Sequence, residues 1–172
     1  LARYLATQEE VPAPVVAQVR AYQDGGAFVD LAMLQLQRAM AGTAVYQEQA
    51  RAVMDKARAR RDRSNQLFAQ TLADGYERSL HATDVTPLHR VWKRVVADEW
   101  RADPEARIYL VVMDGCSYAV FLELLEELAQ DPQLPVGLAT DPRGRPVTVS
   151  SLAPLPTVTS HARGALFLGE LP

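Results

Sequence analysis

One short segment restricts the possible folds of this chain more than any other. Residues 108–113 read IYLVVM, an uncharged and β-rich run without polar alternation. Such a run is typical of a strand that is covered on both faces in a parallel sheet. Asp114 and Gly115 then form a turn signal, and Ser117 is a suitable N-cap for the amphipathic pattern that follows it. The sequence therefore predicts a strand, a turn and a helix of the α/β class.

The residues before this segment follow a helical period instead. Hydrophobic side chains recur every three or four residues, as in the stripe formed by Val29, Met33, Leu36 and Met40. A long and largely solvated helix is predicted from about residue 45 to residue 80. We therefore expect a helical region over residues 1–104 and a separate α/β region over residues 105–172.

Another helix is predicted to begin at Thr86 and Pro87. Threonine is a common N-cap residue, and proline is favoured at the first helical position. Pro104 ends this helix. One of its faces carries only hydrophobic side chains, namely Leu88, Val91, Trp92, Val95 and Trp100. We therefore expect Trp92 and Trp100 to be largely buried, in the core or against a partner.

The composition excludes several classes of protein. Among the 172 residues no apolar run approaches the ~18 that span a bilayer, and the net charge is only −3. The single cysteine, Cys116, rules out an intramolecular disulfide and fits a reducing compartment. The opening residues LARYLATQEE lack the basic start and the apolar core of a secretory signal. We therefore expect a cytoplasmic protein that does not cross a membrane.

The most basic segment is KARARRDR, residues 56–63, which places five basic side chains on one predicted helix. Such a helix face can follow a nucleic-acid backbone. Asp55 and Asp62 interleave with the basic residues, however, and no aromatic residue stands among them for base stacking. A solvated helix face is the favoured interpretation, and contact with nucleic acid stays open.

Asp114 is the first candidate for a functional residue. It stands directly after the predicted strand, at the carboxyl end where open parallel sheets bind their ligands. A carboxylate in such a crevice is a candidate ligand for a cation. The alternative is a plain turn in which Asp114 caps the next helix, and the residues alone leave both interpretations open.

A second group of candidates lies near the end of the sequence. After a proline-rich extended segment, residues 161–168 have helical character and Gly169 is a natural C-cap. Thr159 would then lie at the N-terminus of a helix, where free N–H groups favour an anion such as phosphate. Arg163 follows one turn later on the same face and can bind that anion through its guanidinium. The alternative is that Thr or Ser caps the helix and Arg163 is a surface charge.

In this order the two motifs resemble the PglZ family of BREX-type phage-defence systems, part of the alkaline-phosphatase superfamily. VVMDGCS, residues 111–117, is similar to the family's first motif, an apolar strand followed by Asp-Gly. PLPTVTSHARGALFLGELP, residues 154–172, is similar to its second motif: Pro-Thr-x-Thr, then Arg, then a small-residue helix that ends in Gly-x-x-Pro. The first hundred residues match only in their helical character.

The resemblance implies a helical region followed by the opening strand and helix units of an alkaline-phosphatase-like sheet. It implies that Asp114 and Thr159 bind one divalent metal ion, that Thr159 attacks phosphorus, and that Arg163 lies near the substrate phosphoryl group. Two metal ions, expected to be zinc, act in such a domain. The spacing of the second motif matches Thr159, rather than Thr157, to the nucleophile. Side-chain oxygens of Asp114 and Thr159 should then lie about 4 to 5 Å apart.

The implied activity is that of a metal-dependent phosphohydrolase, a phosphodiesterase acting on nucleic acid, with other phage-defence proteins and DNA as partners. The superfamily's further Asp and His ligands do not follow Thr159 in this sequence, and His81, His89 and His161 do not supply them. The resemblance therefore implies an N-terminal fragment with a truncated domain over residues 105–172, and the chain by itself is not expected to be a competent two-metal enzyme. The alternative is a non-catalytic helical interaction module, or scaffold, of the defence complex.

Overall fold

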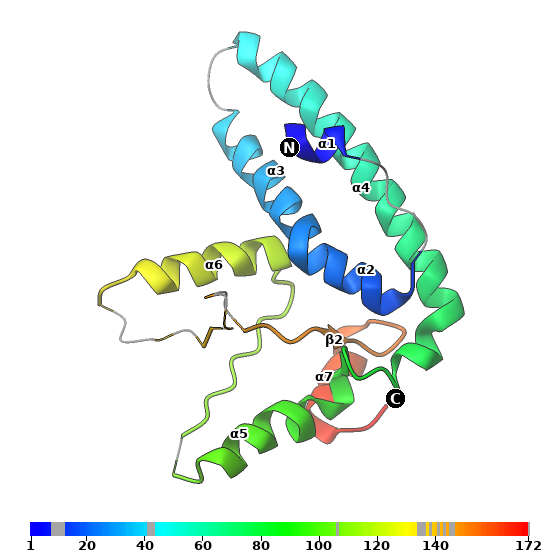
Figure 1. The fold of residues 1–172 in the computed structure, drawn as a ribbon, viewed down its shortest axis with the longest axis vertical. Coiled ribbons are helices and arrows are strands. Elements are labelled where there is room, and N and C mark those ends of the chain that lie inside the picture. Colours follow the sequence, from blue (N-terminus) through cyan, green and yellow to red (C-terminus); the bar gives the residue numbers. More distant parts are fainter. Residues whose placement is uncertain are drawn as a thin grey trace. The chain divides into compact units, whose positions relative to one another are not determined.

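The computed structural model describes residues 1–7, 13–40, 44–105, 107–133, 137, 139–140, 142, 144 and 147–171. Of the described residues 67% lie in helices, and the same residues form two short parallel strands (Figure 1). None of the helices in the described ranges is long and apolar enough to cross a membrane. A mixed class of helices and parallel strands agrees with the α/β prediction in this coarse form. The chain forms two compact units: unit 1, Leu1–Tyr76 with Cys116–Leu138, and unit 2, Glu77–Gly115 with Ala139–Pro172.

Unit 1 is built from helices. Its elements are α1 (Ala2–Ala6), α2 (Val15–Ala21), the π-helix η1 (Tyr22–Gly26), α3 (Ala27–Ala39), most of α4 (Ala44–Ser79) and α6 (Tyr118–Gln130). α2, η1 and α3 follow one another without a break, and α3 packs against α6. The buried hydrophobic side chains of this unit, several of them small, allow the helices to approach closely: Val15, Ala27, Leu31, Met54, Ala57 and Ala119.

Two helix predictions in this unit are confirmed. The long polar helix expected from about residue 45 to 80 is α4, and the pattern after Ser117 is α6. The Ser117 hydroxyl caps α6 by accepting a hydrogen bond from the backbone N–H of Val120 at 3.3 Å. The predicted hydrophobic stripe of α3 is only half-buried, because Ala27 and Leu31 take the most buried positions of this helix.

Two arginines of the basic segment turn inward. Arg60 is buried, donates hydrogen bonds to the backbone carbonyls of Tyr4 and Thr7, and lies with its guanidinium 4.2 Å from the Tyr4 ring centre. Arg61 forms an ion pair with Asp30. The interpretation of this segment as a solvated face is therefore wrong for Arg60 and Arg61. It holds for the other three basic side chains, which are exposed.

Unit 2 contains the two strands. Its elements are β1 (Thr86–Pro87), the 3-10 turn η2 (Leu88–Arg90), the π-helix η3 (Trp92–Val96), α5 (Ala97–Ala102), β2 (Ser151–Leu152) and α7 (Thr159–Leu168). β1 and β2 are parallel, with Thr86 paired to Ser151. α7 packs against η2, and Gly169, whose φ is 73°, ends α7 next to the backbone of His89. The predicted glycine C-cap is therefore confirmed.

Three predictions for unit 2 are wrong. Residues 108–113 are extended but form no strand, and their side chains are exposed. Thr86 and Pro87 pair with β2, so the helix predicted to begin at them begins at Leu88 instead, with Pro87 as its N-cap residue, and runs through η2, η3 and α5 to Ala102. Trp92 and Trp100 are 38% and 59% exposed rather than buried. A short apolar run becomes a strand only when a neighbour takes up its backbone hydrogen bonds, and no described residue does so for residues 108–113.

Of the two strands predicted for the last third of the chain, the structure shows part of one. Of the strand expected over residues 147–152, Ser151 and Leu152 form one in the structure. The edge strand expected near Val136 to Ala139 lies largely outside the described residues. The predicted boundary between residues 104 and 105 stays a prediction.

Candidate functional site

Thr159 is the first residue of α7, as predicted. Val158 before it has extended backbone angles (φ −93°, ψ 145°) and is the N-cap residue, and its side chain makes no cap hydrogen bond. The Thr159 hydroxyl has no hydrogen-bond partner among the described residues. As far as the structure describes the chain, the N–H groups of the first turn have no side-chain acceptor, so the positive end of the helix dipole can attract an anion.

Asp114 and Arg163 are in contact, although they are 49 positions apart in the sequence. Arg163 Nη2 donates a hydrogen bond to Asp114 Oδ2 at 3.2 Å. Asp114 lies at a turn, where Gly115 has a positive φ of 73° that favours glycine. Arg163 lies one turn after Thr159 and is exposed, as Thr159 is. The structure thus brings the aspartate of the first motif to the helix of the second.

This ion pair is open to solvent. The side chains of Arg163 and Asp114 keep 60% and 52% of their accessible surface. An exposed pair of this kind contributes about 0 to 1 kcal/mol to stability, because water screens the charges and two flexible side chains lose entropy. Arg163 can therefore exchange Asp114 for another anion at little cost to the fold.

The capping roles in the alternative interpretations are wrong. Asp114 does not cap α6, because the Ser117 hydroxyl does. Thr159 does not cap α7, because Val158 occupies the N-cap position. The rest of these interpretations agrees with the structure, since Asp114 lies in a turn and Arg163 is a surface charge that pairs with Asp114.

The oxygen atoms at this site suit a divalent cation but do not complete a site for one. A carboxylate and a hydroxyl are oxygen ligands of the kind that hard cations prefer. Asp114 and Thr159 offer two side chains, whereas zinc takes at least three protein ligands and usually four. Within the described ranges, no three His, Cys, Asp or Glu side chains gather closely enough to hold a metal ion. The two residues can therefore be only part of a metal site.

His161 does not add to this site. It is partly buried, whereas Thr159 and Arg163 on the same helix are exposed. Its Nδ1 is buried and has no hydrogen-bond partner in the described part of the chain. This burial places His161 on a different side of α7 from Thr159.

Comparison with known proteins does not assign the chain to a family. No family model, curated protein or solved structure matches the chain. The PglZ family, its metal ions and its activity therefore stay predictions that rest on the residues of the two motifs.

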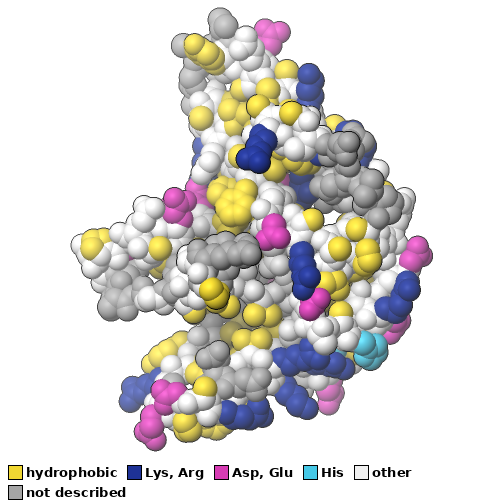
Figure 2. Space-filling model, viewed as in Figure 1, with side chains coloured by type: hydrophobic (Ala, Val, Ile, Leu, Met, Phe, Trp, Pro, Cys, Tyr) yellow, Lys and Arg dark blue, Asp and Glu magenta, His cyan; other side chains and the backbone are white. Residues whose placement is uncertain are grey.

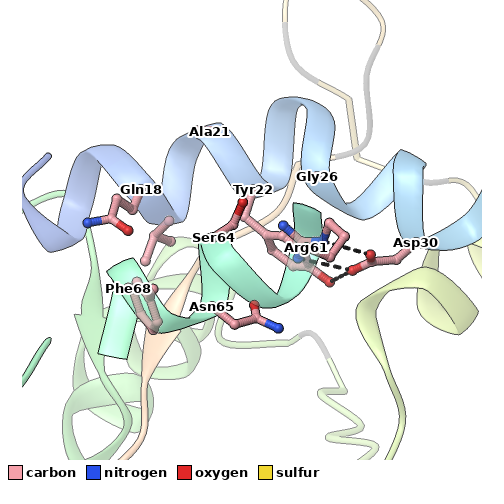
Figure 3. Close-up of a pocket in the computed structure, with 10 residues that line it drawn as sticks. Gln18, Ala21, Tyr22, Gly26, Asp30, Arg61, Ser64, Asn65 and Phe68 are labelled. Atoms are coloured by element: carbon pink, nitrogen blue, oxygen red, sulfur yellow. Dashed lines mark hydrogen bonds and ion pairs between the residues drawn. The ribbon is translucent and has the colours of Figure 1, made fainter. Parts of the chain in front are cut away.

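A pocket in unit 1 was not predicted. It has a volume of about 400 Å³ and lies between the α2, η1 and α3 segment and α4 (Figure 3). Tyr22, Gly26 and Asp30 recur every four residues, which is a signal for one helix face, but nothing in the sequence indicated that α4 lies opposite. The lining combines polar and apolar side chains: Gln18, Val19, Ala21, Tyr22, Gly26, Asp30, Arg61, Ser64, Asn65 and Phe68.

A hydrogen-bond network forms one end of this pocket (Figure 3). Asp30 Oδ1 accepts from Arg61 Nε at 2.9 Å, and Asp30 Oδ2 accepts from Arg61 Nη2 at 3.3 Å. The Tyr22 hydroxyl also donates to Asp30 Oδ2, at 3.0 Å. The Arg61 guanidinium lies 5.1 Å from the Tyr22 ring centre, within cation–π range. One carboxylate therefore holds two side chains from different helices.

Tyr22 should make unit 1 sensitive to alkali. Burial, the hydrogen bond to Asp30 and the Asp30 charge raise the pKa of Tyr22 from 10.0 to about 12. The folded state therefore keeps the phenol proton at pH values where the unfolded state loses it. The resulting stabilisation is complete below pH 10 and is lost as the pH rises from 10 through 12. We expect Tyr22→Phe to remove this part of the alkaline destabilisation in thermal unfolding measured against pH.

The matched control is Tyr46→Phe, because Tyr46 is an exposed tyrosine of unit 1. This variant should follow the wild-type curve throughout. Equal loss of stability in the wild type and in Tyr22→Phe between pH 10 and pH 12 would contradict the effect of the Asp30 hydrogen bond.

Unit 2 has an exposed hydrophobic pocket of about 650 Å³. Its lining comes from η3, α5 and the extended segment: Trp92, Lys93, Val96, Ala97, Trp100, Ile108 and Leu110. Hydrophobic side chains are exposed among Lys and Arg side chains on the face that Figure 2 shows. Open apolar surface of this kind marks interaction sites. The segment predicted as a buried strand thus contributes to an open surface.

Proposed function

We propose that this chain carries the Asp, Thr and Arg part of a PglZ-type, metal-dependent phosphodiesterase of the alkaline-phosphatase superfamily. The observation that carries the proposal is the contact of Asp114 with Arg163 on α7, the helix whose uncapped N-terminus holds Thr159. It joins two motifs that are far apart in the sequence. A structural role would not require this contact, since an exposed ion pair adds little stability.

The exposed end of α7 has the groups that a phosphate ester needs. The uncapped N–H groups and the helix dipole attract the phosphate oxygens. Arg163 lies one turn further on and can move from Asp114 to the phosphoryl group, where it stabilises negative charge. The Thr159 hydroxyl, exposed at the first helical position, is the nucleophile. When bound, a divalent ion lowers the pKa of such a hydroxyl and makes it reactive at neutral pH.

The proposal also explains the exposed apolar residues of the extended segment 108–113. In this proposal the extended residues 108–113 become a strand only when further strands of an alkaline-phosphatase-like sheet take up their backbone hydrogen bonds. The substrate is nucleic acid, and the partners are other proteins of a BREX-type phage-defence system in the cytoplasm. Two zinc ions serve the complete domain, with ligands beyond Asp114 and Thr159.

Replacing Arg163 or Asp114 in the complete protein tests this proposal. Arg163→Ala should lower kcat for metal-dependent phosphodiester cleavage by about 10²-fold and leave the bound metal in place, because it removes one donor to the transition state. Asp114→Ala should lower both metal content and cleavage. Cleavage is measured with a nucleic-acid substrate, and metal content is measured by elemental analysis.

Arg107→Ala is the matched control, because Arg107 is an exposed arginine of unit 2 outside the two motifs. It should cleave at the wild-type rate. Wild-type rates for all three variants would contradict the enzyme hypothesis and leave the scaffold hypothesis.

A second candidate function is a non-catalytic interaction module, and the open pocket around Trp92 and Trp100 favours it. Aromatic side chains are enriched at the energetic centres of protein interfaces. In this case the extended segment and the two tryptophans form a contact surface for another defence protein, and the site at Asp114 takes no part in catalysis.

The tryptophans should contribute less to folding than core residues do. Because Trp92 and Trp100 are 38% and 59% exposed, Trp92→Ala and Trp100→Ala should each lower the free energy of unfolding by less than the about 3 to 5 kcal/mol that truncation of a core tryptophan costs. Denaturant unfolding measures the difference. A loss of the larger size would place the indoles in a core. Loss of binding to a defence protein with unchanged stability and unchanged cleavage supports the interaction module.

A further inference from the structure

We propose that the pocket of unit 1 binds a nucleobase, either as a free nucleoside or as one base of a single strand. The pocket lies within unit 1, whereas Asp114, Thr159 and Arg163 belong to unit 2. The proposal is therefore independent of the phosphodiesterase proposal. The volume of about 400 Å³ lies in the usual range of small-molecule sites.

Three polar side chains of the lining have hydrogen-bonding groups that no described residue uses. Arg61 is only 12% exposed, and its Nη1 has no acceptor in the described ranges, because Asp30 takes Nε and Nη2. Gln18 donates through Nε2 to two protein oxygens, so its amide oxygen is an open acceptor. Asn65 makes no hydrogen bond to any described residue, and its amide offers both a donor and an acceptor.

The rest of the wall is aromatic and aliphatic. Phe68 and Tyr22 contribute aromatic rings, and Val19 and Ala21 contribute aliphatic surface. Bases bind such walls by stacking on, or packing against, aromatic side chains, and this contact tolerates any base. The apolar wall therefore suits a flat ring, and the polar groups suit a ring with amide-like edges.

The charge of the pocket favours a neutral ligand. Arg61 and Asp30 neutralise each other through two hydrogen bonds. Tyr22 is uncharged at neutral pH, since the ordinary phenol pKa of 10.0 lies well above pH 7 and burial and the neighbouring Asp30 raise it further, to about 12. A free phosphate would find no uncompensated positive charge in this lining. A neutral and flat molecule with donors and acceptors on its edge has the chemistry of a nucleobase.

The backbone beside the pocket has an uncommon form. η1 is a π-helical segment of five residues between two α-helices, and it supplies Tyr22 and Gly26 to the lining. π-Helical turns are rare and are found frequently at functional sites. A Cβ atom on Gly26 would lie 2.7 Å from Tyr22 Cδ2, so the ring can take this position only beside a glycine. The segment therefore sets the Tyr22 ring in the wall of the pocket.

Calorimetric titration of the complete protein with adenosine, cytidine, guanosine, uridine and thymidine tests the proposal. We expect at least one nucleoside to bind one to one with a Kd below about 1 mM. The corresponding 5′-monophosphate should bind with similar affinity, because the lining has no net positive charge. Titration with a short oligothymidylate distinguishes a free nucleoside from one base of a single strand as the ligand. Binding of the oligonucleotide well above that of thymidine identifies a single strand as the ligand, and the reverse identifies a free nucleoside.

Asn65→Leu is the decisive variant, because Asn65 is exposed and its replacement removes an unused amide. It should weaken the binding by about tenfold or more, the effect of one hydrogen bond to a bound ligand. Gln66→Leu is the matched control, since Gln66 is the exposed neighbour on α4 outside the lining. Phe68→Leu, which removes the stacking ring, is the second test and keeps the proposal falsifiable if Asn65→Leu unfolds. Thermal unfolding checks the fold of every variant.

Several results would overturn the proposal. One is the absence of binding by every nucleoside and by the oligonucleotide at millimolar concentration. Another is equal affinity of Asn65→Leu and Gln66→Leu in folded protein. A third is binding of indole without binding of any nucleoside, which would make the pocket an apolar cavity.

Discussion

Replacing Thr159 by alanine is expected to abolish metal-dependent phosphodiester cleavage by the complete protein, with a loss of at least about 10³-fold in kcat. The hydroxyl is the proposed nucleophile, and no neighbouring side chain of α7 can replace it at the first helical position. The fold should be unaffected, because the Thr159 hydroxyl has no hydrogen-bond partner among the described residues and its side chain is exposed. Alanine also has a higher helix propensity than threonine.

The control for this prediction is Thr157→Ala, which removes the other hydroxyl of the Pro-Thr-x-Thr segment. It should retain cleavage, because Thr157 lies before the helix rather than at its first position. An inactive Thr157→Ala beside an active Thr159→Ala would shift the nucleophile by two residues. Full activity of both variants would mean that neither hydroxyl attacks phosphorus.

Local sequence signals were sufficient for several parts of the fold. The cap at Ser117, the start of α7 at Thr159 and the glycine after α7 each depend on a few neighbouring residues, and the structure has them as predicted. The long helix α4 follows from a polar sequence with few helix breakers. These features are set within one or two helical turns, so they can be predicted without knowing what packs against them.

The parts that failed depend on distant neighbours. Residues 108–113 have the composition of a buried strand, but a strand also needs a partner, and no sequence pattern says where that partner is. The same holds for Trp92 and Trp100, whose hydrophobic face has no described element to cover it. Arg60 and Arg61 were expected to be solvated. The groups that accept their hydrogen bonds, at Thr7 and Asp30, lie far away in the sequence, so the residues around the two arginines do not indicate them.

The candidate site was predicted only in part for the same reason. Periodicity placed Thr159 and Arg163 on one face of a helix, which is a local inference, and the structure agrees. The resemblance implied that Asp114 and Thr159 share a metal ion and that Arg163 lies near the phosphoryl group. The contact between Asp114 and Arg163 that the structure has was not predicted. The role of Thr159 as a ligand of the same metal ion stays a prediction, since two side chains do not complete a metal site.

Arg61→Met should destabilise unit 1 by about 2 to 4 kcal/mol, somewhat below the cost of breaking a fully buried ion pair. Arg61 and Asp30 are 12% and 26% exposed, so water can reach the remaining carboxylate only in part. The substitution removes two hydrogen bonds to Asp30 and leaves it the one from the Tyr22 hydroxyl. Methionine keeps most of the side-chain length, so the effect reports the lost charge rather than a cavity.

A matched comparison lies in the other unit. Arg163→Met breaks an ion pair of one hydrogen bond whose members are 60% and 52% exposed, and it should cost less than about 1 kcal/mol. The double variant Asp30→Leu with Arg61→Met should be less destabilised than Arg61→Met alone, because no buried charge then lacks a partner. Hydrogen exchange of amides in α3 and in the first two thirds of α4 measures unit 1 separately from unit 2. Equal protection in Arg61→Met and Arg163→Met would mean that burial does not strengthen the Asp30 pair, and it would remove the basis for a fixed Arg61 in the pocket wall.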